Sequence, residues 1–199
     1  PLFDFKNKTG IVGELVSELK ERNQFGGFGN MSFNYEYMKR ILERKMQEAN
    51  VEVLYNTTYS RTLVEQKRVY GIIAENISGR FAVMAKMIVD CTGDGNVAAN
   101  AGCSFELGEN GDYTACQAMT LMFLVGNIPE KYRNGLMLYE KLGAAYEKAG
   151  KQIPFKVPYL IPVPHSHFGV VQFTHMYDYD PLCAKALTEA TMEGRAQII

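Results

Sequence analysis

A short stretch of glycines and oxygen-bearing side chains holds the residue types best suited to ligand chemistry. Thr92-Gly93-Asp94-Gly95 follows an apolar segment and precedes a run of small residues. Glycines let the backbone come close to a ligand, because no side chain blocks the approach. The amides that open a following helix would add partial positive charge, which suits a phosphate or a polarised carbonyl. Thr92 adds a hydroxyl, and Asp94 can accept a hydrogen bond from a sugar hydroxyl.

The same residues also permit a purely structural interpretation. A connection from a strand to a helix commonly carries Asp as the N-cap and Gly as a loop residue, and Asp94 and the two glycines fit those roles. The turn is not the dinucleotide fingerprint Gly-x-Gly-x-x-Gly, which opens at the first strand of its fold and does not occur in this chain. The spacing alone therefore leaves both interpretations open.

The segments around the turn predict the elements that position it. Met87–Asp90 is short and continuously apolar up to its last residue, which predicts a strand buried on both faces of a parallel sheet. Val97–Ala101 predicts a helix that Gly102 ends. Before the turn, segments separated by turn-forming residues predict a small antiparallel meander, at residues 59–65, 68–75 and 80–85. An extended segment, Val51–Tyr55, precedes the meander.

The remaining patterns predict an α/β protein with two parts. Thr9 and Asn34 are expected to cap two amphipathic helices near the N-terminus. Later residues predict strands at 118–125 and 169–173, edge strands or extended chain at 153–164, a helix within 128–150 around Leu138, Leu142 and Tyr146, and a last helix at 181–198. We expect residues 1–108 to form part of one domain and residues 109–199 to belong to a second, mixed domain.

Composition restricts the class of protein and its partners. The 199 residues are 47% hydrophobic and 22% charged, which is ordinary for a soluble globular chain, and the net charge of −1 gives no basic field to attract nucleic acid or an anionic membrane. No apolar run is long enough to span a bilayer. The four cysteines form no Cys-x-x-Cys pair and are expected to be free thiols. We expect a cytoplasmic protein without a metal site.

The three histidines are a weaker candidate site. His165 and His167 on an extended segment would place both rings on one face, where they could bind a metal, or they could be polar residues near a turn. Alternatively, one of the three histidines, which include His175, could face a substrate pocket and transfer a proton there. No catalytic acid or base is assigned.

Ordered matches along the chain resemble the bacterial FAD-dependent oxidoreductase family of the glutathione-reductase-like flavoprotein fold. The likeness covers most of the chain and is strongest from Val51 to Val125. The segments that carry it are Gly10–Leu15, Phe33–Leu42, Val51–Tyr55, Gly71–Asn76, Ser78–Arg80, Val89–Ala98, Ala101–Gly108 and Met119–Phe123.

The resemblance implies a cofactor and a set of contacts. FAD would lie along the turn near its sugar-phosphate part, so the implied cofactor-binding residues are Cys91, Thr92, Gly93, Asp94 and Gly95. Tyr59 matches the position whose backbone meets adenine. The family usually has Ala at the position of Cys91, a tolerable departure because the backbone makes that contact. Residues 1–108 would then be a partial FAD-binding domain, and 109–199 part of a substrate domain for a small organic substrate.

The resemblance also implies that the chain is an internal fragment. The family's glycine-rich phosphate loop lies upstream of every segment matched here, and Pro1 and Ile199 read as cut ends. We therefore expect weak or absent FAD binding, and no activity, in the isolated chain. The alternative function is a non-enzymatic ligand-binding or assembly module with an incidental glycine turn. Substrate, electron acceptor and oligomeric state do not follow from the sequence.

Overall fold

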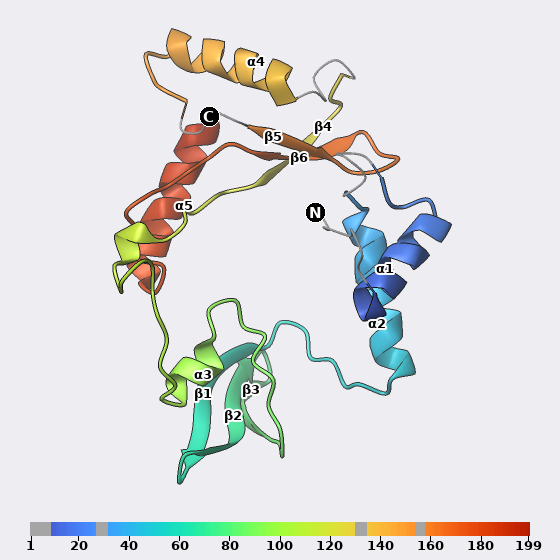
Figure 1. Ribbon diagram of the computed structural model, residues 1–199, viewed down its shortest axis with the longest axis vertical. Coiled ribbons are helices and arrows are strands. Elements are labelled where there is room, and N and C mark those ends of the chain that lie inside the picture. The colour runs from blue at the N-terminus through green and yellow to red at the C-terminus, as the bar shows by residue number, and fades with distance from the viewer. Residues whose placement is uncertain (1–8, 27–31, 130–134, 154–157) are drawn as a thin grey trace. The chain divides into compact units, whose positions relative to one another are not determined.

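The computed structural model describes residues 9–26, 32–129, 135–153 and 158–199, which form two compact units. One unit spans residues 50–111, and the other combines residues 1–49 with residues 112–199. Helices and two small antiparallel sheets make up a mixed α/β structure, as predicted (Figure 1). The assignment of residues 1–108 and 109–199 to FAD-binding and substrate domains stays a prediction.

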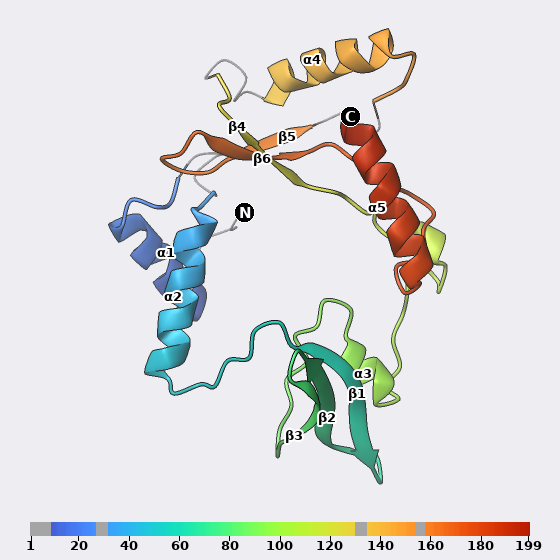
Figure 2. The same cartoon turned by 180° about the vertical axis from the view of Figure 1, so that it is seen from behind.

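The first unit, residues 50–111, is built on the predicted meander. Its strands β1 (Thr58–Glu65), β2 (Arg68–Asn76) and β3 (Gly79–Met84) pair antiparallel in the order β1-β2-β3. Gln66 and Lys67 both have positive φ in the tight turn between β1 and β2, a backbone that matches the twist of the strands it joins. The short helix α3 (Asn96–Asn100) lies beside β1 in Figures 1 and 2, and Gly102 follows it with φ +88°.

Two apolar segments of this unit do not form the elements that their composition predicts. Met87–Asp90 is not a strand, and Met87 and Val89 are 81% and 79% exposed. Val51–Tyr55 likewise forms no strand, and most of its apolar side chains are about half exposed. A strand needs a neighbour for its backbone hydrogen bonds, and no strand among the described residues pairs with either segment. The prediction of a doubly buried strand at Met87–Asp90 is therefore wrong for this structure.

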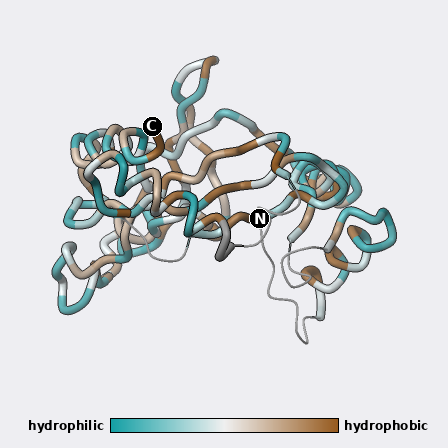
Figure 3. Tube along the Cα trace, turned by 90° about the horizontal axis from the view of Figure 1, so that it is seen from above, coloured by the Kyte–Doolittle hydropathy of each residue, from teal (hydrophilic) through white to brown (hydrophobic). Residues whose placement is uncertain are grey.

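The other unit begins with a helix pair, α1 (Gly10–Glu21) and α2 (Tyr35–Glu48). Asn34 caps α2 as predicted, since its Oδ1 accepts a hydrogen bond from the Glu36 amide at 3.1 Å. Thr9 occupies the N-cap position of α1, but its side chain makes no capping hydrogen bond. The tube in Figure 3 alternates between hydrophilic and hydrophobic colours along its helices. Apolar residues of α1 and α2 meet in a small core together with Phe33, which precedes α2: Leu15, Leu19, Phe33, Met38 and Ile41.

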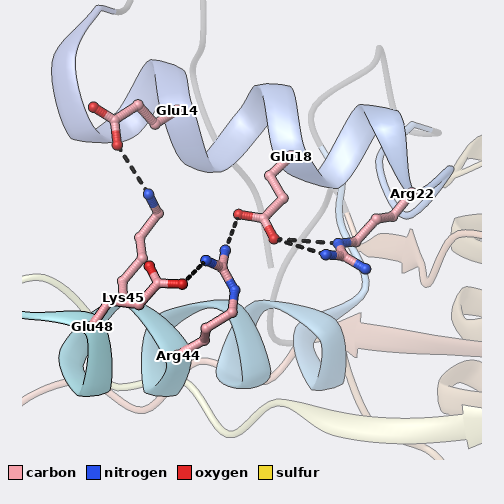
Figure 4. Close-up of polar contacts among 6 residues, drawn as sticks. All are labelled: Glu14, Glu18, Arg22, Arg44, Lys45 and Glu48. Atoms are coloured by element: carbon pink, nitrogen blue, oxygen red, sulfur yellow. Dashed lines mark hydrogen bonds and ion pairs between the residues drawn. The ribbon is translucent and has the colours of Figure 1, made fainter.

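Ion pairs join the polar sides of α1 and α2 (Figure 4). Glu18 of α1 bonds Arg44 of α2 at 2.5 Å and Arg22 of its own helix at 3.2 Å. Lys45 of α2 bonds Glu14 of α1 at 2.9 Å. Burial by itself would raise the pKa of Glu18, but the arginine contacts outweigh burial and leave that pKa below its ordinary value. The network therefore favours the ionised glutamate.

The rest of this unit is a sheet with two helices. The strands are β4 (Phe123–Gly126), β5 (Tyr159–Pro162) and β6 (Phe168–Gln172), in the order β4-β6-β5, so the proline-containing β5 is an edge strand, as predicted. The helices are α4 (Gly135–Lys148) and α5 (Ala184–Ile198). Phe173, 2% exposed, is central to the core and meets Phe123 and Tyr146 edge-on at centroid distances of 5.7 and 6.1 Å. Part of the predicted proline-rich stretch, residues 154–157, lies outside the described residues.

Candidate functional site

The turn between residues 90 and 98 is organised by Asp90. Its Oδ1 accepts hydrogen bonds from the Thr92 amide at 3.0 Å and from the Thr92 hydroxyl at 2.6 Å, and its Oδ2 accepts one from the Ala98 amide at 2.9 Å. The Thr92 hydroxyl, followed by the Ala98 amide, lowers the pKa of this carboxyl below its ordinary value, because both bonds favour the ionised form. Asp90 thus joins the start of the turn to the helix behind it.

The hydrogen-bonding groups expected to meet a ligand are partly engaged within the turn. The Thr92 hydroxyl, which donates to Asp90, also accepts from the Asn96 amide at 2.8 Å. The Ala98 amide is taken by Asp90. Helix α3 has only five residues, so the Asn96 and Ala98 amides are a large part of the N–H groups at its N-terminus that could bond a ligand. These two amides therefore have internal acceptors, and phosphate binding by the start of α3 stays a prediction.

Asp94 does not cap the helix. The N-cap residue of α3 is Gly95, in the left-handed conformation at φ 65° and ψ 35°, and the side chains that bond the first amides of the helix are those of Thr92 and Asp90. The Asp94 carboxylate is exposed and has no hydrogen-bond or ion-pair partner among the described residues. Of the two roles that the sequence left open for Asp94, the structural one is excluded, and the carboxylate stays available to an external donor.

The outward face of the turn consists of Cys91, Gly93 and Asp94, all exposed. A Cβ atom built on Gly93 would meet no heavy atom within 4 Å, and Gly93 does not have the positive φ that Gly95 has. A flat or extended ligand could therefore lie against the backbone here, with the Asp94 carboxylate beside it. This open face fits a cofactor held mainly by backbone contact, which is the kind of contact that the resemblance assigns to Cys91.

Thr62 connects the turn and its helix to the meander. This buried residue on β1 is 5% exposed, and its hydroxyl bonds both the Val97 carbonyl of α3, at 2.9 Å, and the Tyr59 hydroxyl, at 2.6 Å. The Thr62 amide donates to Asn100 Oδ1 at 2.8 Å. The structure therefore places Tyr59 in the same unit as residues 91–95, with Thr62 bonding both Tyr59 and the helix that follows the turn.

Sequence reasoning missed the residues that hold this site. The sequence predicts Asp90 as the end of a strand and Thr62 only as one residue of the extended segment at 59–65. A polar side chain at an inward position of a strand is a usable signal for a buried hydrogen-bond partner, and Thr62 carries that signal. For Asp90, its position two residues before Thr92 is typical of a turn in which the side chain bonds the backbone two residues on.

The three histidines are not grouped in the way that the metal-site interpretation requires. His165 and His167 occupy the turn between β5 and β6, with His165 at φ 53°, so the extended segment on which the metal interpretation depended is not present. The backbone of His175 is held by Gln197 of α5, whose side-chain amide bonds both its N–H and its carbonyl at 3.1 Å. No group of three or more His, Cys, Asp or Glu side chains suited to a metal occurs in the described ranges.

Two further observations concern the helices and the cysteines of the described residues. Among the helices that the structure describes, none has the length and apolar character needed to cross a membrane. All four cysteines are free thiols.

Comparison with known proteins bears on the cofactor. The family model described as FAD dependent oxidoreductase matches residues 4–199, nearly the whole chain. No curated protein and no solved structure matches. The bacterial origin and the glutathione-reductase-like fold that the resemblance implied stay predictions.

Proposed function

Because the chain belongs to the FAD dependent oxidoreductase family, whose cofactor is FAD, we propose that residues 91–95 form one wall of the FAD site. The observation that carries this proposal is the open face at Gly93, where no side chain stands between the backbone and a ligand. The exposed Asp94 carboxylate, with no partner among the described residues, supports it further.

The residues proposed to line the FAD site contribute in different ways. Cys91 and Gly93 contact the cofactor through their backbone, and the Asp94 carboxylate accepts a hydrogen bond from a hydroxyl of the sugar or ribityl part. Thr92 contributes shape rather than a contact, because its hydroxyl is engaged by Asp90 and Asn96. Tyr59 contributes its backbone near adenine, since its hydroxyl is bonded to Thr62.

The reaction we propose is oxidation or reduction of a small organic substrate. FAD supplies the redox chemistry when bound, and the protein supplies binding, orientation and electrostatics. We place substrate binding in residues 109–199 and assign no catalytic acid or base. We propose a cytoplasmic location, which the four free thiols support.

We further propose that the chain works within a larger flavoprotein and is inactive alone. Support comes from Val51–Tyr55 and Met87–Val89, whose apolar side chains are largely exposed although their composition suits buried strands. Such segments would gain backbone and side-chain partners from a further part of a sheet. The isolated chain should be colourless, and a preparation that is yellow with one FAD per chain would contradict this part of the proposal.

The substitution Gly93→Leu tests the wall directly. A leucine there fits the turn, because the Cβ position is open and the backbone is not left-handed, but its side chain would occupy the space proposed for FAD. The matched control is Gly143→Leu, at another glycine with open space and no positive φ, in α4. In the complete flavoprotein, FAD affinity is measured by titrating the apoprotein and following flavin fluorescence.

We expect Gly93→Leu to abolish FAD binding and Gly143→Leu to leave the affinity as in the wild type. Thermal unfolding of both apoproteins checks that the variants fold. If Gly93→Leu binds FAD as the unsubstituted protein does, the turn is not a wall of the site, and the glycine turn is incidental.

A further inference from the structure

We infer that Asp90 is a positioning residue for FAD, acting through Thr92 to shape the turn before the cofactor binds. This inference rests on the proposed FAD wall at residues 91–95. Asp90 is itself no member of that wall: its two carboxylate oxygens are occupied by the Thr92 amide and hydroxyl and by the Ala98 amide. We therefore assign it an effect on the cofactor through the geometry of the residues that it holds.

The turn needs such a residue because its helix cannot hold it in place alone. Isolated helices shorter than about 12 residues are marginal in water, and α3 has five. Bonds from outside the helix must therefore fix it. The described contacts that do so are those of Asp90 and Thr92 to its first amides and those of Thr62 to the Val97 carbonyl and the Asn100 side chain.

The two oxygens of Asp90 have different partners, which makes the role specific to a carboxylate. Oδ1 serves Thr92 and Oδ2 serves Ala98. An asparagine could keep one acceptor, but its NH₂ group would then face an N–H donor on the other side. Asp90→Asn should therefore break one side of the bridge while leaving the size of the side chain unchanged.

Thr92 offers a second, independent test of the same bridge. Its hydroxyl links Asp90 to the Asn96 amide. Thr92→Val removes the hydroxyl and keeps the branched shape, whereas Thr92→Ser keeps the hydroxyl. If the bridge positions the turn, serine restores what valine removes.

Asp112 and Thr114 provide a matched control within the same chain. Asp112 Oδ1 accepts from the Thr114 amide at 2.9 Å and from the Thr114 hydroxyl at 2.7 Å, a local pattern close to that of Asp90 and Thr92. Among the described residues, Asp112 makes no third bond to a helix amide. Asp112→Asn and Thr114→Val therefore measure the effect of losing such a turn in the other compact unit, outside residues 91–95.

The experiment uses the complete flavoprotein and two measurements. FAD affinity is measured by fluorescence titration of the apoprotein, and hydrogen exchange of the Asn96 and Ala98 amides is measured in the apoprotein without FAD. If the bridge is lost and nine in ten apoprotein molecules leave the binding geometry, the apparent Kd for FAD rises roughly tenfold, because only the competent fraction binds. We expect that rise, and faster exchange of both amides, for Asp90→Asn and Thr92→Val.

Thr92→Ser should keep both the affinity and the slow exchange, and the variants at Asp112 and Thr114 should change neither. If Asp90→Asn does not fold, Thr92→Val and Thr92→Ser decide the question by themselves. Wild-type FAD affinity in Asp90→Asn or Thr92→Val, together with loss of binding in Gly93→Leu, would overturn the positioning role alone. Unchanged binding in Gly93→Leu would instead remove the proposed wall on which the inference rests.

Discussion

Replacing Thr62 by valine should release α3 from the meander while keeping the shape of the buried side chain. The Thr62 hydroxyl bonds the Val97 carbonyl and the Tyr59 hydroxyl, and the residue is 5% exposed. Valine removes this donor, while the Val97 carbonyl still accepts the Ala101 amide within α3 at 3.0 Å. One intramolecular hydrogen bond contributes about 0.5–1.5 kcal/mol net, so we expect a loss of about 1 kcal/mol in the stability of this contact.

Hydrogen exchange followed by mass spectrometry resolves the effect by region. A loss of about 1 kcal/mol corresponds to roughly fivefold faster exchange of peptides that cover α3, since each 1.36 kcal/mol is a factor of ten. Thr62→Ser keeps the hydroxyl and loses only a methyl group, so its exchange should be closer to that of the wild type.

Thr174 supplies the control for this prediction. It is fully buried, and its hydroxyl donates to the Leu121 carbonyl at 3.0 Å and accepts from the Leu121 amide at 2.8 Å. Thr174→Val removes an equivalent hydroxyl from the other compact unit and should speed exchange there without affecting α3. Equal exchange of α3 in Thr62→Val and Thr62→Ser would refute the reasoning, because the hydroxyl would then contribute nothing.

Two further predictions concern the other unit. Phe173→Ala should lower the free energy of unfolding by about 3–5 kcal/mol, because it empties the centre of a core, whereas Phe168→Ala, at a 51% exposed side chain, should cost far less in the same urea titration. The pKa of Glu18 is depressed in the folded chain, so its ion pairs stabilise the helix pair above the ordinary pKa of 4.5, and this contribution is lost as the pH falls through the lower folded-state pKa. Arg44→Ala should flatten that acid dependence in circular dichroism, and an unchanged pH profile would show that the pair contributes nothing.

Local chemistry was sufficient to predict much of the secondary structure. The extended segments and the turn-forming residues between them predicted the meander, and the side chain of Asn34 predicted the start of α2. Caps and tight turns depend on residues only a few positions apart. The family match over residues 4–199 supports the FAD dependence that the resemblance implied.

Prediction failed where an element depends on a partner distant in the sequence. Met87–Asp90 has the composition of a buried strand, but a strand exists only as a member of a sheet, and the described residues supply no neighbour for it. A short apolar segment indicates which side chains would be buried in a strand, but it does not indicate whether a neighbouring strand is present.

The turn at residues 90–98 shows most clearly what the sequence determines and what the tertiary structure determines. From the sequence alone came its place before a short helix and the residue types able to meet a cofactor. Tertiary structure decided which of their atoms are free: Thr92 and the Ala98 amide are engaged by Asp90, and the Asp94 carboxylate is not engaged by any described residue. Hydrogen-bonding capacity belongs to the residue type, whereas its use depends on which groups the fold brings within about 3 Å.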